Sequence, residues 1–166
     1  MIRVTFPDET IVDIEENVIQ TIQFYEQQNP WSKEAGGVLI GKKLQDIEHY
    51  VLTAVSVPTG FDKRTRFSFV RSIKSAQPFI NRHWKDSDGI ENYIGEWHTH
   101  PEYKPTPSPT DRELIKRVVS EKSSLFPKIF LIIGGLNGTF YFGVANAAEL
   151  GDILFSKQLE VSYEHI

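Results

Sequence analysis

The chain has 166 residues, which suffices for one domain with a substantial core but not for two ordinary ones, so we predict a single domain over residues 1–166. Hydrophobic residues make up 40% and charged residues 24% of the chain, proportions that exclude a disordered or fibrous protein. The formal net charge of −4 lacks the basic character typical of nucleic-acid-binding proteins, so no nucleic-acid partner is expected.

Periodicity divides the first half of the chain into short elements. Residues 2–6 and 10–14 alternate apolar and polar side chains on either side of a turn, which predicts a hairpin. Apolar residues recur at helical spacing over residues 15–28, and Pro30 disfavours helix beyond that point. The core face of the hairpin is predicted to contain Val4, Phe6, Val12 and Ile14; later elements are a buried strand from Gly36 to Gly41, strands over 47–57 and 64–70, and a helix over 74–85 with Phe79, Ile80 and Trp84 inward.

The second half of the chain is organised around a strand predicted over residues 92–100, packed by Ile94 and Trp97. Residues 101–109 follow with four of the nine prolines, and their restricted backbone suits a loop that holds a side chain in place. The elements expected after this loop are a helix over 109–121, strands over 128–135 and 139–145 joined by an Asn-Gly turn, and a short element and a strand within 149–166.

Two features of the sequence bear on the location of the protein and on its partners. No apolar run reaches the length of a signal peptide or the roughly 20 residues of a membrane span, so we expect a cytoplasmic protein without a membrane segment. A group of cations between residues 63 and 74 is typical of a solvated face, and a docking surface for an acidic partner is the alternative. This group consists of Lys63, Arg64, Arg66, Arg71 and Lys74.

The most informative stretch is Trp97-His98-Thr99-His100-Pro101. Side chains of a strand alternate between its two faces, so His98 and His100 share one face and both imidazoles can bind one ion. The chain contains no cysteine, so a metal site must use nitrogen and oxygen ligands. Asp111 follows and completes a set of three, and a catalytic zinc holds three protein ligands and an open position for water. We interpret this stretch as a hydrolytic metal site.

Ser108-Pro109-Thr110-Asp111 also has a purely structural explanation. Ser108 suits a helix N-cap, Pro109 the first helical position and Asp111 the partner in a capping box. Both roles are compatible, because one oxygen of Asp111 can bind an ion while the other accepts a hydrogen bond.

Glu34 on its own is typical of a surface residue, and the glycine-rich strand that follows it favours a functional role. His49, His83 and His165 have no neighbour at metal-ligand spacing, so each is expected to be a surface or half-buried histidine.

Taken together, Glu34, His98-x-His100-Pro101 and Pro107-Ser108-x-x-Asp111 resemble the signature of the JAMM metalloproteases, also called the JAB/MPN family. The resemblance includes the glycine-rich strand, and the predicted element order is compatible with it over residues 2–145. It implies an α/β fold like that of cytidine deaminases, with a mixed, curved sheet flanked by helices. The short chain looks like the compact prokaryotic members, including those of antiviral CBASS systems.

The resemblance also implies roles for five residues. His98, His100 and Asp111 correspond to the ligands of a zinc ion, Glu34 to the general base that deprotonates water, and Ser108 to a donor to the oxyanion. The implied reaction is hydrolysis of a peptide or isopeptide bond after the C-terminal glycine of ubiquitin or a ubiquitin-like protein. That protein or its conjugate is the expected partner.

Other functions remain as alternatives. A processing peptidase for sulfur-carrier proteins could use the same active site, because such carriers also end in paired glycines. An inactive MPN interaction module is the alternative from a different class. A RadC-like protein is disfavoured because Glu102-Tyr103 replaces the expected Ser-Gly, and a nucleoside deaminase is excluded because its cysteine ligands are absent.

Overall fold

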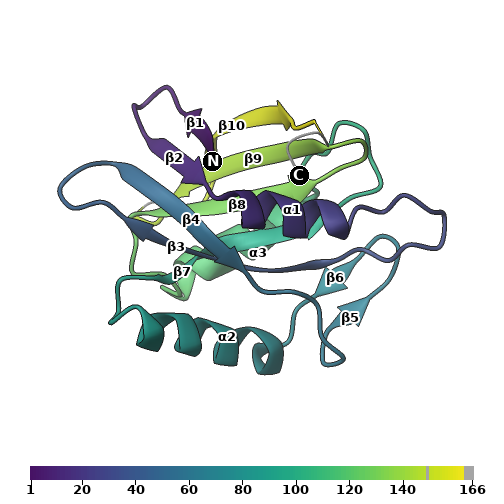
Figure 1. Cartoon of the computed structure of the whole chain (residues 1–166), viewed down its shortest axis with the longest axis horizontal. Coiled ribbons are helices and arrows are strands. Elements are labelled where there is room, and N and C mark those ends of the chain that lie inside the picture. The colour runs from purple at the N-terminus through teal and green to yellow at the C-terminus, as the bar shows by residue number, and fades with distance from the viewer. Residues whose placement is uncertain (149, 163–166) are drawn as a thin grey trace.

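A mixed eight-stranded sheet forms the centre of the molecule in this computed structural model, which describes residues 1–148 and 150–162 (Figure 1). Its strands are β1 (Ile2–Thr5), β2 (Ile11–Ile14), β3 (Gly36–Lys43), β4 (His49–Val55), β7 (Asn92–Thr99), β8 (Lys128–Gly134), β9 (Thr139–Asn146) and β10 (Ile153–Glu160). They lie in the order β1-β2-β4-β3-β7-β8-β9-β10. The pairs β2/β4 and β7/β8 are parallel and the other neighbours are antiparallel. A separate short hairpin consists of β5 (Lys63–Arg64) and β6 (Phe69–Val70).

Three helices in the described residues cover the two faces of the sheet: α1 (Glu16–Phe24), α2 (Ile73–Asp86) and α3 (Pro109–Ser120). Leu39 of β3 packs in the same hydrophobic cluster as α1, whereas Val38 and Ile40 pack with α2 and α3. Because neighbouring side chains of a strand point to opposite faces, α1 covers one face and the other two helices cover the opposite one. This is the α/β fold with a curved sheet flanked by helices that we predicted.

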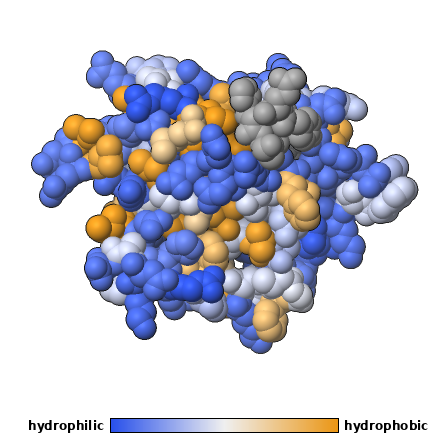
Figure 2. All heavy atoms as spheres, viewed as in Figure 1, coloured by the Kyte–Doolittle hydropathy of each residue, from blue (hydrophilic) through white to orange (hydrophobic). Residues whose placement is uncertain are grey.

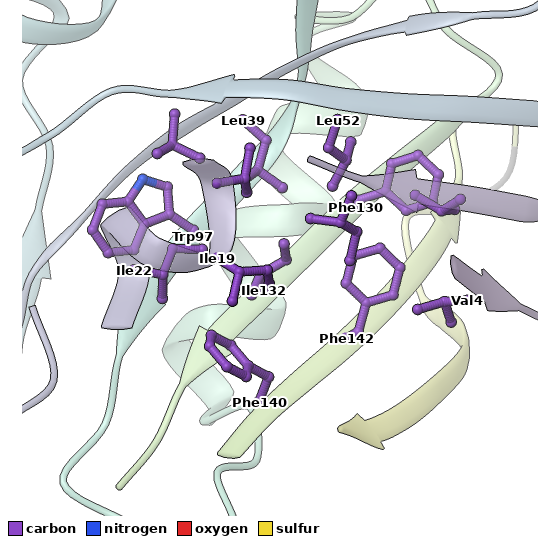
Figure 3. Packing of buried hydrophobic residues seen from close by; sticks show 14 of the residues in the cluster. Val4, Ile19, Ile22, Leu39, Leu52, Trp97, Phe130, Ile132, Phe140 and Phe142 are labelled. Carbon is purple, nitrogen blue, oxygen red and sulfur yellow. The ribbon is translucent and has the colours of Figure 1, made fainter. Parts of the chain in front are cut away.

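Large buried side chains fix the position of β7 in the middle of the sheet. Ile19 and Ile22 of α1 lie among Trp97, Ile132 and Phe140 (Figure 3). Trp97 also donates a hydrogen bond from its indole nitrogen to the carbonyl oxygen of Ser56, at 2.8 Å. Burying a side chain of this size stabilises the fold by roughly 1.5–3 kcal/mol. β7, which carries His98 and leads directly into His100, is therefore packed firmly in the core.

Most predicted elements are present, with ends shifted by a few residues. The core face of the first hairpin is buried as predicted, and Ile94 and Trp97 are buried in β7. The predicted strand and short element near the C-terminus correspond to β10 alone within the described residues, because residues 149 and 163–166 lie outside them. None of the described helices has the length and hydropathy that a membrane-spanning segment needs.

Three structural predictions were wrong. Residues 64–70 do not form one strand, because Thr65 and Ser68 close a turn through their backbones and their side-chain oxygens, at 2.9 and 2.7 Å. Helix α1 ends at Phe24 rather than at residue 28, since the side chain of Gln27 turns inward to make tertiary hydrogen bonds. Trp84 is 51% exposed and packs over the turn at Gly89 instead of facing the sheet.

Hydrophobic residues also reach the surface in several groups between hydrophilic ones on the face drawn in Figure 2. Exposed aromatic side chains include Phe61, which precedes the β5–β6 hairpin, and Phe67, which lies in its turn. Their surroundings are considered below, because this hairpin adjoins the functional site.

Candidate metal centre

His98 of β7, His100 just after this strand and Glu34 meet because of the register between β3 and β7. Gly36 pairs with His98 in this antiparallel ladder, so the residue two positions before Gly36 lies opposite the residue two positions after His98. Glu34 and His100 are therefore neighbours, and their side-chain atoms Oε1 and Nε2 are 4.0 Å apart. The ligand atoms of Glu34, His98 and His100 all lie within 4.8 Å of one another.

Asp111 reaches the same cluster from the first turn of α3. The predicted capping box is present: the Ser108 hydroxyl accepts a hydrogen bond from the Asp111 amide at 3.1 Å, and Asp111 Oδ2 accepts one from the Ser108 amide at 2.7 Å. The other carboxylate oxygen, Oδ1, lies 2.9 Å from His98 Nε2, and Oδ2 lies 3.2 Å from His100 Nε2. One side chain thus caps the helix and faces both histidines.

The donor atoms of this cluster are placed to bind a metal ion rather than to hydrogen-bond to one another. Among the described residues His98 Nε2 is buried without a hydrogen-bond partner, although Asp111 Oδ1 is only 2.9 Å away, because the two atoms are not aligned for a hydrogen bond. Glu34, His98, His100 and Asp111 are all between 4% and 8% exposed. Two imidazole nitrogens and a carboxylate oxygen that converge in a buried site match the preference of zinc. The geometry therefore indicates a metal cofactor.

Burial and charge set the protonation of the site. Burial raises the pKa of the Glu34 carboxyl to about 6, against the opposing effect of the two histidines. Burial alone would raise the pKa of Asp111, but the nearby imidazoles of His100 and His98 and the hydrogen bond from the Ser108 amide outweigh this effect and lower that pKa. Asp111 is therefore an anion at neutral pH, whereas Glu34 is a base that gains a proton readily.

Sequence reasoning missed the groups that hold Glu34 in place. The Glu34 amide donates to the carbonyl oxygen of Thr65 at 2.7 Å, and its carbonyl accepts from Arg64 Nε at 2.9 Å. Gln27 makes a second link, donating to the Arg66 carbonyl at 2.8 Å while it accepts from the Thr99 hydroxyl at 3.0 Å. These partners are far apart in the sequence, so no local pattern signals them.

Glu102 is a further residue near the cluster that the sequence did not single out. Its Oε1 lies 3.1 Å from His100 Nδ1, on the side of the ring away from Asp111, although the two atoms are not aligned for a hydrogen bond. Glu102 belongs to the proline-rich loop, which is tied down at Glu102 by the Leu136 amide and at Pro105 by Gln158. Its position two residues after His100 is the sequence feature that could have indicated a place near the cluster.

A cavity of about 380 Å³ opens beside the cluster. Glu34, His98 and Asp111 reach into it. One wall carries Phe69, Val70 and Ile73, and α3 contributes Leu114, Arg117 and Val118 to the other. Arg71 and the buried Glu96, two residues before His98, pair in this cavity at 2.6 Å. A substrate segment can therefore approach the cluster between the β5–β6 hairpin and α3.

The other two described histidines, His49 and His83, do not join the cluster. His49 bonds to Asp13 at 2.7 Å, at the opposite end of β4 from the site. His83 lies on α2 with its ring 4.6 Å from that of Phe79. His165 lies outside the described residues.

Comparisons with known proteins agree with this geometry. The family described as "Prokaryotic homologs of the JAB domain" matches residues 18–145. The chain is 36% identical over 136 residues to the CD-NTase/cGAS isopeptidase of Vibrio cholerae serotype O1, across 80% of this chain and 83% of that relative. It is 32% identical over 105 residues to the probable metalloprotease y4qB of Sinorhizobium fredii, across 61% and 63% of the two chains. The solution structure of protein DSY2949 from Desulfitobacterium hafniense is similar in fold, with a TM-score of 0.57 at 14% identity and coverages of 93% and 97%.

Proposed function

The chain belongs to the prokaryotic JAB-domain family, and from this premise we propose that it is a zinc-dependent isopeptidase that cleaves after the C-terminal glycine of a ubiquitin-like protein. One observation carries the proposal: His98 Nε2 is buried without a hydrogen-bond partner, in a cluster that also contains His100, Asp111 and Glu34. A structural helix cap with two histidines beside it gives no reason for a buried, unpaired imidazole nitrogen.

His98, His100 and Asp111 are the proposed ligands of the zinc ion. Asp111 is the third ligand rather than Glu34, because it lies 2.9 and 3.2 Å from the two histidines, whereas Glu34 is 4.0 Å from His100. A zinc ion here would lower the pKa of water from about 15.7 towards 7 and polarise the scissile carbonyl.

The side chains of the chain then carry the proton and the negative charge. Glu34, with a pKa of about 6, takes a proton from the attacking water and delivers it to the departing amine. The Ser108 hydroxyl, next to Asp111, donates to the developing oxyanion. Thr65 and Arg64 keep the backbone of Glu34 in place during both transfers.

The names of the relatives suggest the substrate class. The Vibrio cholerae relative is named a CD-NTase/cGAS isopeptidase. We therefore propose as substrate an isopeptide conjugate of a CD-NTase with a ubiquitin-like protein, in the antiviral CBASS context. Precursor processing of a ubiquitin-like protein is the related reaction of the same site.

Removal of the metal tests this function directly. We expect the purified protein to contain about one zinc ion, as measured by elemental mass spectrometry, because the site offers one set of three ligands. Dialysis against a chelator should abolish cleavage of a CD-NTase conjugate, and added Zn²⁺ should restore it whereas Mg²⁺ should not. Full activity of a zinc-free preparation would refute the mechanism.

Ser108 offers a second test, because its two roles can be separated. Ser108→Ala should lower kcat by about 100-fold through loss of the oxyanion donor and should cost about 1 kcal/mol of stability through loss of the cap. Ser72 is a matched control: it caps α2 by accepting from the Lys74 amide at 3.1 Å. Ser72→Ala should lose similar stability in urea unfolding and retain cleavage. Equal activity of the two variants would leave Ser108 only its structural role.

A further inference from the structure

Cations gather around the β5–β6 hairpin although the whole chain is acidic. Residues 59–74 contain five of the 18 lysines and arginines but one of the 22 acidic residues. Lys33 joins this group, because Arg64 Nη2 donates to its carbonyl oxygen at 3.4 Å. The basic strip is defined here as Lys33, Lys63, Arg64, Arg66 and Lys74.

The charges of the basic strip are not neutralised within the described part of the chain. None of its five members forms an ion pair with a described carboxylate, whereas nearby Arg71 pairs with Glu96. Arg64 and Arg66 donate to main-chain carbonyls instead. The nearby carboxylate, Asp62, accepts hydrogen bonds from Ser72 and two other groups of the adjoining turn. The strip therefore presents net positive charge to solvent.

Exposed aromatic rings accompany the cations. Phe67 is 77% exposed and lies 5.7 Å from the Arg66 guanidinium, and Phe61 is 62% exposed and lies 5.4 Å from the Lys74 ammonium. Apolar surface next to unpaired charge is the composition of a protein-binding site rather than of a purely solvated face.

The basic strip adjoins the catalytic cavity, although none of its five members lines it. Lys33 immediately precedes Glu34, and Phe69, Val70 and Ile73 of the same region line the cavity. The facing wall carries Glu113 of α3, Glu121 just after that helix and Arg117 between them. That wall therefore has a net charge of −1, opposite in sign to the basic strip beside the cavity, which favours one orientation of a charged chain that enters it.

We propose that the basic strip docks an acidic segment of the substrate protein, adjacent to the bond that the metal centre cleaves; the assignment rests on the proposed isopeptidase function. Asp and Glu side chains of this segment pair with the lysines, and its apolar side chains contact Phe61 and Phe67. Its small terminal residues enter the cavity. A nucleic acid fits less well, because it carries a phosphate at every nucleotide, whereas the small terminal residues of the peptide that enter the cavity beside Glu113 are uncharged.

Binding of labelled peptides tests the proposal without any cleavage. Two peptides share a Gly-Gly end and differ in having either Glu or Lys before it, and fluorescence anisotropy measures their affinity for the Glu34→Gln protein at low and at physiological salt. The acidic peptide should bind about tenfold more tightly than the basic one, and its affinity should fall as salt rises. Lys33→Glu combined with Lys63→Glu should remove this preference, since neither side chain makes a hydrogen bond within the described residues.

Lys85→Glu combined with Lys157→Glu is the control, because both lysines are exposed, lie at the end of α2 and on the edge strand β10, and change the net charge by the same amount as the double variant. It should leave peptide binding unchanged. Equal binding of both peptides, or an acidic peptide that binds the double variant as well as the parent, would overturn the docking proposal. Tighter binding of a single-stranded DNA oligonucleotide than of the acidic peptide would also overturn it. If the parent protein did not cleave the conjugate although the peptides bound as expected, the isopeptidase function would be refuted and the docking proposal would stand.

Discussion

Glu34→Gln is expected to lower kcat for cleavage of a CD-NTase conjugate by about 1,000-fold, because an amide cannot take the proton of water or deliver it to the leaving amine. The bound zinc should remain, since Glu34 is not one of the three proposed ligands. The measurement is a single-turnover cleavage assay together with the zinc content of the same preparation.

Glu48→Gln is the control for this change. Glu48 accepts a hydrogen bond from Tyr50 at 2.8 Å, at the end of β4 remote from the site. This variant should cleave at the parent rate. A Glu34→Gln protein that also cleaves at the parent rate would leave the chain without a general base, and the proposed mechanism would be wrong.

Glu34→Gln should also stabilise the metal-free protein above pH 6. Burial raises the pKa of Glu34 to about 6, above its usual value near 4.3, so the ionised carboxylate opposes folding. Below pH 4 the group is protonated in both the folded and the unfolded state and the two proteins should be equally stable. The difference in free energy of unfolding, measured in urea, should grow as the pH rises towards 7.

Asp111→Asn is expected to lower zinc affinity by about 100-fold or more and to abolish cleavage. Residues that only hydrogen-bond to a metal ligand already change metal affinity by about 10–100-fold when substituted, so the loss of a ligand itself should cost at least as much. The substituted amide can still accept the Ser108 hydrogen bond that Oδ2 accepts in the parent. Helix α3 should therefore persist while the metal is lost. Zinc affinity is measured by competition with a chromophoric chelator, and helix content by circular dichroism.

Asp62→Asn provides the comparison for Asp111→Asn. Asp62 also accepts backbone hydrogen bonds next to a helix start, from Ser72 at 2.6 Å and from Thr59 at 2.8 Å, but faces no histidine. Its amide variant should retain zinc. If both variants retained zinc equally, Asp111 would be only a helix cap and the predicted ligand set would be wrong.

Local patterns predicted the parts of the site that local chemistry determines. Alternation along β7 places His98 and His100 on one face, and the capping box places Asp111 at the start of α3; both features depend on neighbours within a few residues. The proximity of Glu34 depends on the register between β3 and β7, whose strands are more than 50 residues apart. Only the family resemblance brought Glu34 to the site before the structure did.

The errors have a common physical cause. Propensity favoured a strand over residues 64–70, but the Thr65 and Ser68 pairing closed a turn there, and a bond to Thr99 drew Gln27 out of α1. In both places side-chain hydrogen bonds outweighed the local pattern. Trp84 has the helical spacing of an inward-facing residue, but its side chain packs against the turn near Gly89, just beyond the end of α2.

The attachment of Glu34 to the hairpin has a consequence for timing. Residue 34 is attached to the β5–β6 hairpin, because its amide donates to the Thr65 carbonyl and its carbonyl accepts from the Arg64 side chain. A tilt of the hairpin would carry the carboxylate towards or away from the histidines, and a shift of about 1 Å can change a rate by about 100-fold. A substrate chain that binds and steadies this hairpin would thus align Glu34 with the histidines when the cavity is occupied. With the cavity empty, Glu34 would be misaligned and other peptide bonds would not be cut.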